Sequence, residues 1–298
     1  MKRILTAAAL ASGLTGWQAG QDLTLAQTQA PAPAGNIVID YVEPADPKRL
    51  FVDDKDLQAQ FLRSKDIYDR MTKHRLLERY KEFLSPLRLV GTLRIRIKDC
   101  DEGAFFDRGD TSVTLCYDYI AGFEATAPKD GEPNKDFTPE GITYDDAVVG
   151  SIVGSLLHET GHALFYMFQI PVLGREEDAA DQIAAFVMLQ FGKDVGRMMI
   201  KGSLWKMHNF AGQNVSYWDQ HSSPKQRFSN FICIAYGADP DSFKELITFL
   251  QPETRVNNCA REYAQVRLAF MTTVMPHIDE VLMQKILEKK WVELLEGK

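Results

Sequence analysis

Residues 158–165 read HETGHALF, which places two histidines four positions apart with a glutamate directly after the first. On an α-helix, positions i and i+4 project from one face, so His158 and His162 can both reach one metal ion. Glu159 lies about 100° further round the helix, where it can act on a metal-bound water but cannot easily join the same ligands. The spacing therefore predicts a zinc site with its own general base.

A catalytic zinc site needs a third protein ligand and an open position. The segment 175–182, REEDAADQ, offers four acids, and a helical wheel places Glu177 and Asp181 at the edge of its core face. Buried carboxylates need a cation or a histidine N–H, so we expect one of these two to bind the zinc and the other to accept from a liganding histidine. Glu176 is a further candidate for the ligand, and Asp178 is predicted to be solvated. The plain alternative is an acidic first turn that complements the helix dipole.

This geometry requires that the segment with the two histidines and the segment with the four acids each form a helix. Thr143 and Asp146 form a capping-box pattern, which predicts a helix from about Asp145 to about Phe168, before Pro171 ends it. The second helix is predicted to begin near Arg175. The first helix is apolar apart from one stripe, and three ionisable groups on that stripe argue against a membrane span. The stripe contains Ser151, Ser155, His158, Glu159 and His162.

The rest of the chain predicts an α+β fold that is mostly helical, with a small sheet or hairpin before the motif helix. Periodicity favours one helix over 56–84. Segments 89–97 and 110–117 alternate like strands, and DRGD at 107–110 could turn between them to make a hairpin. The strand at 113–116 could offer its edge to an extended substrate. We predict a single zincin-like domain over 41–298.

The N-terminus predicts export. Lys2 and Arg3 precede a short apolar run at 4–14 and small residues, which indicates a signal peptide over 1–26. The apolar run is too short to span a bilayer, so no stable membrane span is expected after its removal. A Pro/Ala-rich linker is predicted over 27–40. Localisation is therefore predicted as secreted or periplasmic, and the net charge of −7 without a basic run argues against a nucleic-acid partner.

Four cysteines in an oxidising compartment indicate two disulfides among three possible pairings. We favour the sequence-local pairs, Cys100–Cys116 and Cys233–Cys259. Buried free thiols are the alternative.

These motifs resemble those of known metallopeptidase families. HExxH at 158–162 followed by ExxAD at 177–181 resembles the gluzincin pattern, and the ExxAD form is similar to that of the CAAX prenyl endopeptidase group. Three stretches resemble a family of secreted bacterial metallopeptidases catalogued as a domain of unknown function: GAFFDRGDTSVTLCYDY, IPVLGREEDAADQ and DQHSSPKQRFSNFICIAYGADP. The resemblance covers residues from about 40 to about 280. It implies a zinc peptidase with Glu177 as third ligand, which leaves Asp181 to orient a liganding histidine, and it implies no particular substrate.

A further helix is predicted after Ser223, with Pro224 at its first position and Gly237 as its stop. His221 precedes this helix, and the resemblance implies that it stabilises a developing oxyanion; an ordinary loop histidine is the alternative. Arg227 is predicted to be a plain surface arginine, with pairing to an acid of the site as the alternative. Three aromatic residues could line a pocket, although their spacing is more often that of core residues: Trp205, Tyr217 and Trp218.

The sequence thus predicts an exported zinc metallopeptidase in which Glu159 activates a zinc-bound water to hydrolyse a peptide or protein substrate. Two alternatives stay open: a non-enzymatic exported protein with a structural metal site, and a cell-wall amide hydrolase. The presence of Glu159 favours an enzyme, because a structural site needs no general base.

Overall fold

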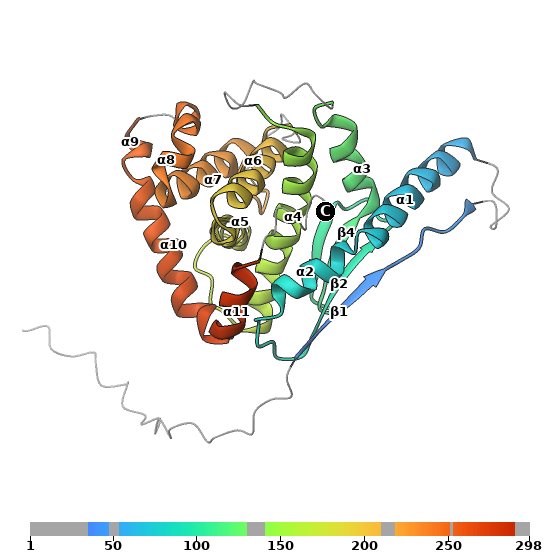
Figure 1. Cartoon of the computed structure of the whole chain (residues 1–298), viewed down its shortest axis with the longest axis horizontal. Helices are drawn as coiled ribbons and strands as arrows, with labels where there is room; N and C mark the ends of the chain where they lie inside the picture. Colours follow the sequence, from blue (N-terminus) through green and yellow to red (C-terminus); the bar gives the residue numbers. More distant parts are fainter. Residues whose placement is uncertain (1–34, 48–53, 130–140, 210–217, 251–252, 290–298) are drawn as a thin grey trace, which may run out of the picture. The chain divides into compact units, whose positions relative to one another are not determined.

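The computed structural model describes residues 35–47, 54–129, 141–209, 218–250 and 253–289 (Figure 1). All of them belong to one compact unit, Pro33–Lys298. The predicted signal peptide and most of the predicted linker lie outside the described residues. The prediction of a mostly helical α+β fold is confirmed.

The elements are β1 (Asn36–Tyr41), α1 (Lys55–Lys73), α2 (Leu76–Leu84), β2 (Thr92–Lys98), β3 (Ala104–Asp107), β4 (Ser112–Cys116), α3 (Tyr117–Thr126), α4 (Tyr144–Met167), α5 (Glu176–Met188), α6 (Lys193–Asn209), α7 (Pro224–Ala238), α8 (Pro240–Phe243), α9 (Glu253–Val256), α10 (Cys259–Thr273) and α11 (Glu280–Leu287).

The sheet has four strands in the order β1-β2-β4-β3. β1 pairs with β2 and β2 pairs with β4, both in parallel, whereas β3 pairs with β4 antiparallel. The predicted hairpin of segments 89–97 and 110–117 is therefore wrong: the turn after Asp107 joins β3 to β4. Alternation identifies a strand but not its partner, and the four-residue β3 was too short to stand out.

β4 lies inside the sheet and is buried along its whole length. It cannot offer an edge to a substrate, so that prediction is wrong, and β3 is the edge strand on this side. Residues 36–40, assigned to the linker from the sequence, belong to β1. Their side chains are mostly half-buried against the sheet, which the linker interpretation missed.

The helix predicted over 56–84 is two helices, α1 and α2. Arg75 adopts the left-handed conformation (φ 54°) between them. The backbone N–H of Leu77 donates to the hydroxyl of Tyr41 at 2.7 Å, which satisfies one of the free donors at the start of α2. Because Tyr41 belongs to β1, the break depends on a contact that the local sequence does not contain.

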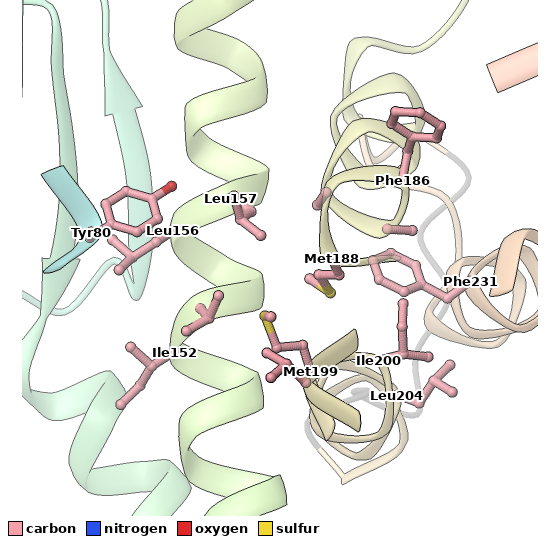
Figure 2. Packing of buried hydrophobic residues seen from close by; sticks show 14 of the residues in the cluster. Tyr80, Ile152, Leu156, Leu157, Phe186, Met188, Met199, Ile200, Leu204 and Phe231 are labelled. Atoms are coloured by element: carbon pink, nitrogen blue, oxygen red, sulfur yellow. The ribbon is translucent and has the colours of Figure 1, made fainter. Parts of the chain in front are cut away.

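α4 is the central helix of the unit. Its predicted capping box is confirmed, since the Thr143 side chain accepts from the Asp146 backbone while the Asp146 side chain accepts from the Thr143 backbone. Figure 2 shows Ile152 and Leu156 on one side of α4 and Met199 of α6 on the other. The helix packs against α5 and α6, and also against α3, β3 and β4. Burial on all sides explains why its sequence is apolar except for one stripe.

α4 and α6 approach each other closely at two glycines. A Cβ at Gly150 would lie 2.8 Å from the Cα of Gly202, closer than real Cβ atoms come. Glycine at both positions lets the two backbones meet, which fixes the register of α6 along the polar stripe of α4.

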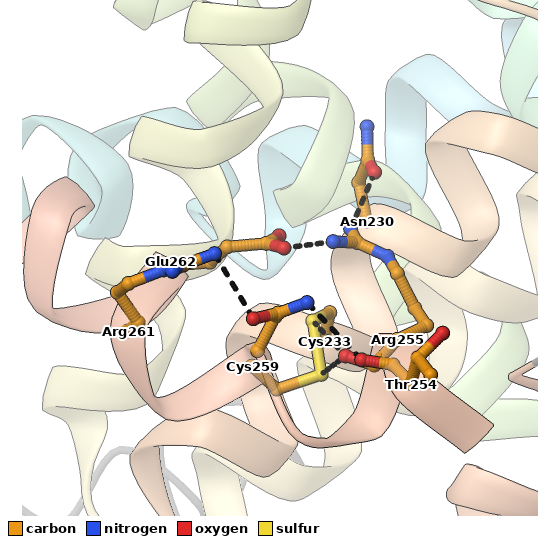
Figure 3. Close-up of a disulfide and its surroundings, with 8 residues drawn as sticks. Asn230, Cys233, Thr254, Arg255, Cys259, Arg261 and Glu262 are labelled. Atoms are coloured by element: carbon orange, nitrogen blue, oxygen red, sulfur yellow. Dashed lines mark hydrogen bonds and ion pairs between the residues drawn. A yellow bond between two sulfur atoms is a disulfide. The ribbon is translucent and has the colours of Figure 1, made fainter. Parts of the chain in front are cut away.

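Both predicted disulfides are confirmed. Cys100 is bonded to Cys116 with Cα atoms 5.0 Å apart, and Cys233 to Cys259 with Cα atoms 4.7 Å apart. The second bridge joins α7 to the start of α10, beside the contacts of Arg255 with Asn230 and Glu262 (Figure 3). Disulfides are consistent with an extracytoplasmic location. In the described parts of the chain, no helix combines the length and apolar character needed to cross a bilayer.

We expect the double variant Cys233→Ser, Cys259→Ser to have a free energy of unfolding lower by about 3–4 kcal/mol, because a bridge across 26 residues restricts the unfolded chain. Urea denaturation at 25 °C measures the difference. Ser229→Ala, a change at a half-buried position of α7 whose hydroxyl donates to the Lys225 carbonyl of the same helix, is the control and should be nearly neutral. A loss below about 1 kcal/mol for the double variant would show that the bridge contributes little.

Candidate metal centre

His158 and His162 lie on the face of α4 that meets α5, and both are buried. Gly161, between them, makes this contact possible. A Cβ at Gly161 would lie 3.1 Å from the Cα of Ala180, a tighter distance than most real Cβ contacts. The absence of a side chain at Gly161 therefore lets the acidic first turn of α5 lie close to the two histidines.

Three donor atoms from these helices converge on one point. The Oε2 of Glu177 lies 3.1 Å from Nε2 of His158 and 3.3 Å from Nε2 of His162. The two Nε2 atoms are 3.3 Å apart. Tetrahedral ligands bonded to zinc at about 2.0–2.1 Å are about 3.3 Å from one another. The donor types and their separations therefore fit a zinc ion.

Each histidine also has a carboxylate on its other ring nitrogen. Asp181 lies 2.8 Å from Nδ1 of His158, where the sequence predicted an orienting acceptor. Glu176 lies 2.8 Å from Nδ1 of His162, a contact that sequence reasoning did not assign. Two histidines on one helical face need two acceptors, and the pair of adjacent glutamates was the signal available in the sequence.

Arg227 is not a surface arginine. Its Nε and one terminal nitrogen donate to the two carboxylate oxygens of Asp181 at 2.6 and 2.8 Å, and its side chain is 20% exposed. Arg108, in the turn after β3, donates to Glu176 at 3.1 Å. Each orienting carboxylate is thus held by an arginine from a different element, α7 in one case and the β3–β4 turn in the other.

The charges of the cluster shift its pKa values strongly. Burial alone would lower the pKa of His158, but the charge and hydrogen bond of Asp181 raise it to about 9. Burial alone would raise the pKa of Glu177, but hydrogen bonds from three histidines hold it well below its usual range. The pKa of Asp181 is also low despite burial, because Arg227 and His158 face it. The carboxylates of Glu177 and Asp181 are therefore ionised, and they stabilise positive charge in the pocket.

His221 lies on the loop before α7, with its Nε2 2.8 Å from Oε2 of Glu177. Its backbone carbonyl accepts from Arg175 at 3.0 Å, and its backbone N–H donates to Asp219 at 2.9 Å. Its side chain is 45% exposed, so it borders the solvent side of the cluster. The loop histidine predicted from the sequence is therefore brought to the site.

Besides the trio of His158, His162 and Glu177, two further sets of three residues have ligand atoms within 4.8 Å of one another: His158, Glu177 and His221, and His158, Glu159 and His162.

Glu159 is buried and its Oε1 lies 4.0 Å from Nε2 of His158, further away than Glu177.

Asp178 is not solvated as predicted: one oxygen accepts from Ser222 at 2.8 Å and the other is buried. The acid thus ties α5 to the loop that carries His221. Trp205 belongs to the core, whereas Trp218 is exposed and Tyr217 lies outside the described residues.

Two cavities open beside the cluster. The larger, about 480 Å³, is lined by His162, Glu177 and Arg175 among others. The smaller, about 260 Å³, is lined by His158, Ser155 and Lys206 among others. Ala104 of β3, Glu159 and His221 line both cavities. These three residues therefore mark the place where the two cavities meet.

A family model described as "Putative metallopeptidase" matches residues 57–273, a range that contains every residue of the cluster. No curated protein and no solved structure matches the chain.

Proposed function

The chain belongs to this "putative metallopeptidase" family, and from that premise we propose that it is an exported zinc peptidase that hydrolyses peptide bonds. The observation that carries the proposal is the convergence of His158, His162 and Glu177 at mutual distances of 3.1 to 3.3 Å. Those are the separations that a tetrahedral zinc site requires.

In this proposal His158, His162 and Glu177 hold the metal. When bound, Zn²⁺ acidifies water and polarises a carbonyl oxygen. Asp181 and Glu176 accept from the outer nitrogens of the two histidines, which fixes each ring in the tautomer whose Nε2 is free to ligate. Arg227 keeps Asp181 ionised and in place.

Glu159 is the general base. It takes a proton from the attacking water and delivers it to the leaving nitrogen, so that one carboxylate serves both halves of the reaction. Its position where both cavities meet suits a group that acts on a bond lying across them. His221, on the open side of the cluster, donates from its ring to the oxyanion that develops on the substrate carbonyl.

The open cavities favour an enzyme over a structural metal site. Structural zinc sites are closed by four protein ligands, whereas catalytic sites keep a position open. Here Glu159 and Glu177 both line a cavity, and β3 offers an edge along which an extended peptide can lie.

We expect the mature protein, purified without chelators, to contain about one equivalent of zinc per chain. Elemental analysis measures it. Treatment with 1,10-phenanthroline should remove the zinc and abolish hydrolysis of a peptide mixture. Mass spectrometry measures the hydrolysis, and added zinc should restore both the metal content and the activity.

The control is the same protein carried through mock treatment and dialysis. Absence of any transition metal after native purification would refute the metal site. Hydrolysis that survives removal of the metal would refute the proposed reaction.

A further inference from the structure

Lys206 stands in the wall of the smaller cavity, near the end of α6. Its Nζ donates to Oγ of Ser155 at 2.9 Å. The Ser155 hydroxyl donates in turn to the carbonyl of Ser151 at 2.9 Å, so it offers Lys206 only a neutral oxygen. An ammonium group has three donors, which leaves two of them for other partners.

The positive charge of Lys206 has no counter-ion among the described residues: no carboxylate there lies within ion-pair distance of it. Lys201, on the same helix, shows the contrast. It is buried and pairs with Asp146 at 3.1 Å. Lys206 is half-buried, so its ammonium group loses part of its hydration, and no carboxylate among the described residues compensates for that loss of free energy.

Other charged groups that line this cavity do not neutralise Lys206. Arg227 is bound through two nitrogens to Asp181. Glu159 is the base of the proposed reaction, and Glu102 is an exposed residue of the rim. Among the described residues that line this cavity, Lys206 is therefore the cation left available to an incoming group.

The cavity lies directly beside the reacting centre. His158 and Glu159 line it together with Lys206, and so does Ala104 at the start of the edge strand β3. A peptide lying along β3 with its scissile bond at Glu159 would place a neighbouring side chain or chain end in this cavity. Tyr119 and Met207 supply less polar walls, which strengthen a charge interaction by excluding water.

We propose that the smaller cavity is a specificity pocket in which Lys206 and Ser155 bind a carboxylate of the substrate next to the scissile bond. This assignment rests on the proposed peptidase function. The carboxylate can be the side chain of an aspartate or glutamate, or the free C-terminus of a peptide. The two sources have the same chemistry and are separated by the peptides used in the test.

The test uses three acetylated decapeptides of otherwise equal sequence. One has a single internal aspartate and an amidated end, the second has asparagine instead, and the third has asparagine and a free C-terminal carboxylate. We expect the wild-type protein to cleave one of the two acidic peptides with kcat/KM about 10- to 100-fold above the neutral one, at a fixed distance from the carboxylate. Which acidic peptide is preferred identifies the source.

The deciding variant is Lys206→Met, which keeps the length of the side chain and removes its charge. It should lower the acidic-to-neutral ratio of kcat/KM to about one while the neutral peptide is still cleaved, which shows that the site is intact. Lys225→Met, an exposed lysine near the start of α7, is the matched control and should keep the wild-type ratio. A preference that is unchanged in Lys206→Met, or cleavage without any acidic preference, would overturn the pocket.

A binding measurement separates this proposal from the peptidase itself. Calorimetry with the Glu159→Gln protein should show tighter binding of the preferred acidic peptide than of the neutral one, and Lys206→Met added to that variant should remove the difference. That result without hydrolysis by the wild type would leave the pocket standing and the proposed reaction refuted. Hydrolysis together with equal binding of all three peptides would refute the pocket alone.

Discussion

Glu159→Gln should lower peptide hydrolysis by at least about 10²- to 10⁴-fold, the loss expected when a general base is removed. The amide keeps the size of the side chain and removes its ability to accept a proton. Because Oε1 of Glu159 is 4.0 Å from Nε2 of His158, against 3.1 Å for Glu177, the zinc content should stay near wild type. Steady-state rates on a defined peptide and elemental analysis measure the two effects.

Circular dichroism and thermal unfolding of the same variant are the control, and both should match the wild type. The contrary result is a Glu159→Gln protein that loses its zinc. That would make Glu159 a ligand, in line with the alternative group of His158, Glu159 and His162, and would favour a structural metal site.

The second large effect is a loss of zinc affinity, and its size should differ between variants of three acidic residues on α5. Structural zinc sites in zinc-finger peptides bind the ion with about 10–16 kcal/mol in total. Glu177→Ala removes one of the three proposed ligands, so we expect affinity to fall by roughly 10³-fold. Glu176→Gln and Asp181→Asn remove only the acceptors on the outer histidine nitrogens, and each should cost about 10- to 100-fold. Competition with a chromophoric chelator measures all three.

Asp178→Asn is the matched control for this series. It lies in the same turn of α5, but it accepts a hydrogen bond from Ser222 and not from a histidine. It should bind zinc within a few-fold of the wild type. Equal losses in Glu177→Ala and Glu176→Gln would show that the third ligand has been misassigned.

The sequence by itself determined the features that depend on neighbours along the chain. The range of α4 and its capping box follow from periodicity and from residues three apart. The start of α5 and the cap of α7 at Ser223 were predicted in the same way. The helical wheel placed Glu177 and Asp181 on the face that meets α4, because on a helix the direction of a side chain is fixed by its position.

The tertiary structure decided everything that depends on distant partners. The break at Arg75 depends on Tyr41. β2 pairs with β4 in parallel, and the connection between these two strands contains β3. Such contacts leave no periodic trace in either segment, so alternation alone could not choose between sheet partners.

The same reason separates the two parts of the site. His158 and His162 are brought together by helical spacing, which the sequence shows directly. The roles of Glu176, Arg227 and Lys206 come from contacts between separate helices, over 14, 46 and 51 positions in the sequence. A charged residue looks alike in the sequence whether it faces solvent or a buried partner, because only packing sets its exposure and its counter-ion. The proposed metal ligands and general base could therefore be read from local pattern, whereas their orientation and the charge of the neighbouring cavity required the fold.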